Sequence, residues 1–216
     1  MINPNIHDFK SKTISTLAQL PITYSLLQKF FLHYFKGHDQ SFKNWLHFYM
    51  QQFEQAYKRK KPVVWASIYT PSELLYAMDV IPLYPEMISA SVASIGLANY
   101  FIETAECNFY LPDLCSFYRV ASGMFQRNCL PNPDMIISTS QLCDGSMKFF
   151  RNASRHYQCD YFLVDTPYEI NQKSKSYLAD ELKNLVKWAE ERTGTRISSD
   201  VLRESLKLAN QSRSKI

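Results

Sequence analysis

Glycine is scarce in this chain of 216 residues, which contains only five. Neither a GxGxxG nor a GxxxxGK[ST] motif occurs in the sequence. Such glycine-rich turns hold nucleotide phosphates because they let the backbone approach them closely. A nucleotide bound in this way is therefore not expected. The GxSxG motif of serine hydrolases and the HExxH motif of zinc proteases are also absent.

Long apolar runs and a strong charge of one sign are missing as well. No apolar stretch reaches the roughly 20 residues that a membrane-spanning helix needs, and the opening MINPNIHDFKSK has no signal-peptide core. We therefore expect a cytoplasmic protein without a membrane partner. The net charge is only +4, and basic residues are interleaved with acidic ones. Because a nucleic-acid backbone needs a broad basic surface, no nucleic-acid partner is expected.

The first part of the chain, residues 1–61, reads as helical. Apolar and aromatic residues recur at spacings of three and four, which is typical of helices that pack against each other. Gly37 divides the segment into two helices. The basic run at 58–61 ends the second helix, where cations complement the helix dipole and Pro62 prevents continuation. A phosphate-binding role for the same run is the alternative.

From residue 62 to 168, short apolar runs alternate with amphipathic segments, followed by a helical extension over 169–216. This pattern predicts an α/β fold: a small, doubly wound parallel sheet of about four strands flanked by helices. The expected strands are Val63–Tyr69, Ile81–Tyr84, Met135–Thr139 and Tyr161–Asp165. The expected helices are Ser72–Met78, Ala90–Thr104, Ser116–Arg127 and Gly145–His156.

The five cysteines decide which chemistry is open to the chain. Without an export signal they argue against a disulfide framework and leave free thiols, metal ligands or core residues. Cys115 and Cys143 each precede a predicted helix, where the dipole favours the thiolate that binds metals or attacks electrophiles. The alternative is that both are small buried apolar residues. Cys129 and Cys159 lie in connecting segments and are interpreted as structural, while Cys107 stays open.

Several motifs, in order, resemble the 2-hydroxyacyl-CoA dehydratase and benzoyl-CoA reductase family. The first is a strand leading to a proline and an acidic helix, followed by a Tyr-Pro-Glu. Two cysteine motifs, a later strand with its proline, and the helices that join the two family domains come next. The matching residues are 62–65, 71–74, 81–86, 114–119, 143–144, 163–167, 177–178, 181–182, 193–194, 197, 202 and 210. The resemblance extends over about residues 45 to 213.

The resemblance implies an iron-sulfur subunit that removes water from a 2-hydroxyacyl-CoA in a reductively initiated radical reaction. A [4Fe-4S] cluster would be held by three cysteines, of which the first two match Cys115 and Cys143. The third comes from a second family domain and has no matching position here. The implied partners are a second subunit or the missing domain, an ATP-dependent activator protein as electron donor, and the acyl-CoA substrate.

The resemblance also implies catalytic residues. Glu86 matches a glutamate that acts as acid-base at the substrate, with a helix-capping or surface glutamate as the alternative. Where the dehydratases have a serine, this chain has Ile68, and the neighbouring Ser67 offers the hydroxyl. A shift of one residue along a strand reverses the side-chain direction, which leaves room for a benzoyl-CoA-reductase-like or other cluster-dependent reductase subunit. Two further readings are a truncated, cluster-free partner or scaffold protein and an unrelated thiol-bearing binding domain.

Overall fold

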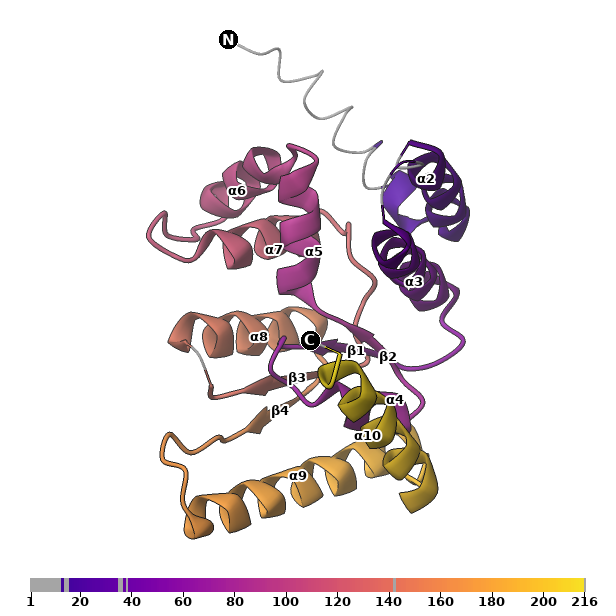
Figure 1. Ribbon diagram of the computed structural model, residues 1–216. Helices are drawn as coiled ribbons and strands as arrows, with labels where there is room; N and C mark the ends of the chain where they lie inside the picture. Colours follow the sequence, from indigo (N-terminus) through magenta and orange to yellow (C-terminus); the bar gives the residue numbers. More distant parts are fainter. Residues whose placement is uncertain (1–12, 14–15, 35–36, 38, 142, 216) are drawn as a thin grey trace. The chain divides into compact units, whose positions relative to one another are not determined.

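The structure is a computed structural model that describes residues 13, 16–34, 37, 39–141 and 143–215. Two compact units make up the chain, and each is assembled from two separate stretches of sequence (Figure 1). Unit 1 comprises Met1–Lys60 and Ile88–Asn132, and unit 2 comprises Lys61–Met87 and Pro133–Ile216.

Unit 1 contains the helices α2 (Pro21–Tyr34) and α3 (Gln40–Lys58), which lie on the two sides of Gly37 as predicted. The first part of the predicted helical segment, residues 1–12, lies outside the described residues. The pair is held by aromatic packing, since the ring of Tyr24 stacks on Phe53 and Tyr57 at centroid distances of 5.1 and 5.5 Å. The Asp39 side chain accepts a hydrogen bond from the Ser41 amide and so caps α3.

The rest of unit 1 is formed by α5 (Pro85–Ser94), which starts in unit 2, α6 (Ala98–Cys107) and α7 (Ser116–Gln126). The single helix predicted over Ala90–Thr104 is wrong. Gly96 has a φ of 78°, a left-handed conformation that glycine adopts without strain and that ends a right-handed helix. Gly123 in α7 lies against the backbone of Phe101, so α6 and α7 pack at very close range.

Unit 2 contains the sheet, whose order is β2-β1-β3-β4 with all strands parallel. The predicted α/β class with a four-stranded parallel sheet is therefore confirmed. The predicted extension of the first strand to Tyr69 is wrong, because the chain turns at Ser67, whose carbonyl accepts a hydrogen bond from the Thr70 amide at 2.9 Å. The strands are β1 (Val63–Ala66), β2 (Ile81–Leu83), β3 (Met135–Thr139) and β4 (Asp160–Val164).

Helices cover both faces of this sheet (Figure 1). One face packs against α4 (Ser72–Ala77), α9 (Gln172–Thr193) and α10 (Ser199–Arg213), and the other against α8 (Asp144–Tyr157). Successive side chains of a strand point to opposite faces of the sheet, and both faces are apolar, so the helices on each side pack against an apolar surface. The core on the first face consists of Val64, Ala66, Leu74, Leu75, Met78, Val80, Met135, Ile137, Val164, Leu185 and Ala189. Within the part of the chain that is described, no helix is long and apolar enough to cross a membrane.

Candidate functional site

The carboxyl ends of β1 and β3 mark the point in unit 2 where ligands are expected. The chain runs from β1 to β2 on one side and places β3 on the other side of β1, which is the topological switch point of a doubly wound sheet. Ser67 follows β1 and is 2% exposed. Its Oγ accepts a hydrogen bond from the Thr139 amide at 3.2 Å and shares one with Thr70 Oγ1 at 3.1 Å.

Thr139, the last residue of β3, brings a second hydroxyl to this switch point. The residue is 3% exposed, and its Oγ1 has no hydrogen-bond partner among the described residues. Leaving a buried hydroxyl unsatisfied costs about 1–3 kcal/mol, and such an atom often marks the place of a water or ligand atom. Thr139 does not stand out in the sequence, because a β-branched residue at the end of an apolar strand is an ordinary strand residue.

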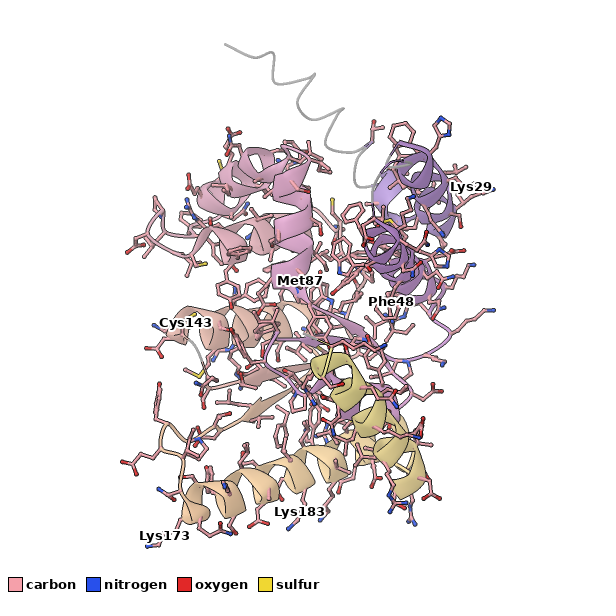
Figure 2. All side chains as sticks on the ribbon, viewed as in Figure 1. Lys29, Phe48, Met87, Cys143, Lys173 and Lys183 are labelled. Atoms are coloured by element: carbon pink, nitrogen blue, oxygen red, sulfur yellow. The ribbon has the colours of Figure 1, made fainter. Side chains whose placement is uncertain are left out.

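Cys143 and Cys115 each occupy the N-cap position of a helix, as predicted. Cys143 lies at the start of α8 and caps it (Figure 2). Its Sγ accepts a hydrogen bond from the Ser146 amide at 3.4 Å. Cys115 caps α7 without a side-chain hydrogen bond to the helix. Both thiols are exposed, so the interpretation of these residues as buried apolar side chains is wrong. Cys143 belongs to unit 2 and Cys115 to unit 1.

The other three cysteines differ sharply in exposure. Cys129 is buried and Cys159 half-buried, whereas Cys107, the last residue of α6, is exposed. Burial raises the pKa of Cys129 and of Cys159 to about 11. Across the described ranges, no group of three or more histidine, cysteine or acidic side chains is arranged to hold a metal ion.

Alkylation at pH 8 should separate the two classes of cysteine. A thiol with a pKa near 11 is ionised in only about one molecule in a thousand at this pH, and the thiolate is the reactive form. We expect iodoacetamide to modify Cys107, Cys115 and Cys143 in the folded protein, while Cys129 and Cys159 react only after urea is added. Site-resolved mass spectrometry measures this, and rapid labelling of Cys129 in the folded chain would contradict it.

Glu86 lies in the first turn of α5, which begins at Pro85, two residues after the end of the strand β2. Its carboxyl group is favourably placed at the positive end of the helix dipole. Glu86 is only 7% exposed, so the alternative of a surface glutamate is wrong. Ile68, for which the sequence resemblance implies a serine in the dehydratases, is 42% exposed. The buried Ser67 and the exposed Ile68 therefore present their side chains to different environments.

A hydrogen-bonded cluster joins the carboxyl ends of β3 and β4 in unit 2. The Ser140 hydroxyl donates to Asp165 Oδ1 at 2.7 Å, and the Tyr177 hydroxyl donates to Asp165 Oδ2 at 2.9 Å. These two bonds, that of Ser140 first, lower the pKa of Asp165, and Asp165 in turn raises the pKa of Tyr177. The Glu181 carboxylate accepts a hydrogen bond from the Asp165 amide at 3.2 Å. No local sequence pattern predicts that these residues meet, because they lie in three separate stretches of the chain, after β3, after β4 and in α9.

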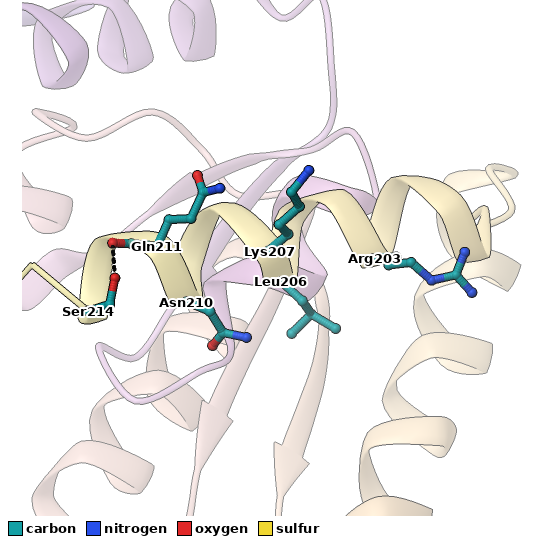
Figure 3. Close-up of a pocket in the computed structure, with 6 residues that line it drawn as sticks. All are labelled: Arg203, Leu206, Lys207, Asn210, Gln211 and Ser214. Carbon is teal, nitrogen blue, oxygen red and sulfur yellow. Dashed lines mark hydrogen bonds between the residues drawn. The ribbon is translucent and has the colours of Figure 1, made fainter.

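A hollow of about 520 Å³ lies elsewhere on unit 2, along α10 (Figure 3). Two of its cations are already paired with acidic neighbours on the same helix, Arg203 with Asp200 at 3.1 Å and Lys207 with Glu204 at 3.8 Å. None of the predicted site residues contributes to it. The lining residues are Arg203, Leu206, Lys207, Asn210, Gln211 and Ser214.

The family described as "2-hydroxyglutaryl-CoA dehydratase, D-component" matches residues 67–216. This range contains the switch point and both N-cap cysteines. The chain belongs to this family. The predicted resemblance to the dehydratase family is thereby confirmed.

Curated relatives in the dehydratase family agree with this assignment. The chain is 27% identical over 171 residues to the (R)-2-hydroxyisocaproyl-CoA dehydratase alpha subunit of Clostridioides difficile, a match that covers 74% of this chain and 42% of the relative. It is 25% identical over 167 residues to the (R)-phenyllactyl-CoA dehydratase alpha subunit of Clostridium sporogenes, covering 73% and 41%. For a benzoyl-CoA reductase subunit of Thauera aromatica, identity is 26% over 148 residues, covering 63% and 34%. The matched part of the chain spans about two fifths or less of the length of these relatives.

Proposed function

We propose that the chain acts as an iron-sulfur subunit of a 2-hydroxyacyl-CoA dehydratase-type enzyme, which removes water from an acyl-CoA in a reductively initiated radical reaction. The observation that carries this proposal is the family match over residues 67–216, which includes two exposed cysteines at helix N-termini. Helix N-termini help to neutralise the negative charge of thiolates.

A [4Fe-4S] cluster suits this donor set, because thiolates are the ligands that such clusters prefer. Cys115 and Cys143 would hold it, with a further thiolate from the exposed Cys107 or from a partner chain. When bound, the cluster supplies one-electron chemistry. An ATP-dependent activator protein would deliver the electron. The relatives are named as alpha subunits, which supports a second subunit as partner.

The chain's own residues supply acid-base chemistry and orientation. Glu86 is proposed as the group that exchanges a proton with the acyl-CoA, since a largely buried carboxyl group at a helix start suits this task. Ser67 is proposed as a hydroxyl that orients the substrate. Ser67 Oγ already forms hydrogen bonds with the Thr139 amide and with Thr70 Oγ1. A substrate atom would therefore replace Thr70 Oγ1 as the hydrogen-bond partner of Ser67.

A related reductase subunit is the second candidate. It is favoured by the similarity to the benzoyl-CoA reductase of Thauera aromatica. Both candidates share the cluster and the acyl-CoA, and they differ in whether water leaves the acyl group. Product analysis with a 2-hydroxyacyl-CoA and with an aromatic acyl-CoA distinguishes them.

The test is the iron and acid-labile sulfide content of the chain purified without oxygen. We expect about four irons per chain, lost in the Cys115→Ser, Cys143→Ser double variant and retained in a Cys159→Ala control. Residual iron in the double variant would remove these cysteines from the ligand set. If the wild-type chain and the control both lack iron, the cluster-bearing subunit is ruled out for this chain on its own, in favour of a cluster-free partner or scaffold.

A further inference from the structure

The turn between β3 and α8 delivers Cys143 from the sheet to the start of a helix. It begins at Ser140, directly after β3, and ends at Cys143, the N-cap of α8. At its far end the Ser146 amide donates to the Cys143 carbonyl at 3.1 Å and to Cys143 Sγ at 3.4 Å. Leu142, within this connection, lies outside the described residues. Ser140 is the point at which the connection is attached to the sheet.

Ser140 is fixed by three hydrogen bonds to the end of β4. Its amide donates to the Val164 carbonyl at 3.0 Å, its hydroxyl donates to Asp165 Oδ1 at 2.7 Å, and the same hydroxyl oxygen accepts from the Thr166 amide at 2.8 Å. Both hydrogen-bonding capacities of the hydroxyl, as donor and as acceptor, are in use. These three contacts restrict both the side-chain rotamer and the backbone of Ser140.

Asp165 is itself held by α9. Tyr177 donates to its second carboxylate oxygen, and Glu181 accepts from its amide. Asp165 and Tyr177 are exposed to solvent. Exposed polar contacts of this kind contribute little to global stability because water competes for them. We therefore expect these hydrogen bonds to order the local backbone and to add little to the free energy of unfolding.

We propose that Asp165 is a positioning residue for Cys143, acting through Ser140, with Tyr177 and Glu181 fixing Asp165. We call these four residues, Ser140, Asp165, Tyr177 and Glu181, the Asp165 brace. The meaning of the brace for cluster binding rests on the proposed function, in which Cys143 is a ligand. Its effect on the turn does not, and can be measured on the chain without iron. If the thiol is already positioned, cluster binding does not have to include the free-energy cost of ordering the backbone around Cys143.

Amide hydrogen exchange of the iron-free, full-length chain tests the brace. The Thr166 amide loses its acceptor directly in Ser140→Ala, whereas the Ser146 amide responds only if the turn transmits the change to Cys143. We expect Ser146 to exchange about fivefold faster or more in Ser140→Ala and in Asp165→Ala. Amides inside α8, such as that of Phe150, should keep their rates. Ser140→Thr keeps the hydroxyl and should restore slow exchange.

Glu169→Ala is the matched control, because Glu169 is an exposed carboxylate in the same loop whose side chain accepts a hydrogen bond from Asn171. It should leave the Ser146 rate unchanged. Faster exchange at Thr166 with no change at Ser146 would overturn the proposal, since the effect would then stop at β4. Faster exchange at Phe150 as well would also overturn it, because Asp165 would then support the fold as a whole.

Cluster retention tests the functional meaning separately. In protein purified without oxygen, Asp165→Ala should lose iron to a chelator about fivefold faster than wild type or Glu169→Ala. Equal rates in all three would overturn the link to cluster binding while the exchange result stands. Absence of iron from the wild-type chain would remove the proposed function and this link together, and the exchange experiment would still decide whether the brace positions Cys143.

Discussion

Replacing Trp65 with alanine is expected to lower the free energy of unfolding by about 3–5 kcal/mol, the cost of deleting a large buried aromatic side chain. Trp65 lies in β1, a central strand of the sheet, and is 0% exposed. Its ring packs edge-on against Tyr157 of α8 at a centroid distance of 5.1 Å. The change therefore leaves a cavity between the sheet and α8 that rigid neighbours on both sides cannot fill.

Urea unfolding followed by circular dichroism measures this effect. Trp45→Ala is the matched control, because Trp45 lies on α3 and is 37% exposed. The control should cost less than about 1 kcal/mol, as is usual for substitutions at partly exposed positions. Similar losses in both variants would contradict the position of Trp65 at the centre of the packing between sheet and α8.

The second large effect is expected for Gly123→Ala in unit 1. This change should lower the free energy of unfolding by about 3 kcal/mol or more, the upper end of the range for overpacked cores. A Cβ atom at this position would lie 2.0 Å from the Phe101 carbonyl oxygen and 2.7 Å from its carbonyl carbon. Both are backbone atoms of α6, so no side chain can rotate away. The contact is relieved only if α6 and α7 move apart.

Gly37→Ala provides the control, since a Cβ atom there meets nothing within 4 Å. Thermal unfolding of the two variants and the wild type gives the comparison. Gly123→Ala should unfold at a clearly lower temperature, and Gly37→Ala within a few degrees of wild type. An unchanged midpoint for Gly123→Ala would contradict the close approach of α6 and α7.

The strands could be predicted because their sequences are short apolar runs bounded by polar or proline-containing segments. Met135–Thr139 was predicted with the bounds that the structure shows, and β4 was displaced by one residue. The parallel arrangement followed from the alternation of such runs with amphipathic segments. The helix starts at Cys115 and Cys143 could also be predicted, because each cysteine directly precedes a segment with an amphipathic helical pattern.

What the sequence could not supply were backbone conformations and contacts between distant residues. The break at Gly96 is set by a left-handed conformation, whereas glycine within a helical pattern is also compatible with an uninterrupted helix. The end of β1 depends on a turn hydrogen bond between Thr70 and Ser67. The unsatisfied hydroxyl of Thr139 and the Asp165 brace depend on which side chains meet in space, and no local pattern encodes this.

The way in which the chain passes between the two units limits how the protein can be divided. It crosses from one unit to the other after Lys60, after Met87 and after Asn132. Neither unit is therefore a continuous stretch of the gene, and no single cut yields one unit intact and separate. A fragment that starts at Lys61 carries all of unit 2 but also residues 88–132, which are then deprived of α2 and α3. In the design of truncated variants, residues 88–132 should therefore be regarded as an insertion within unit 2.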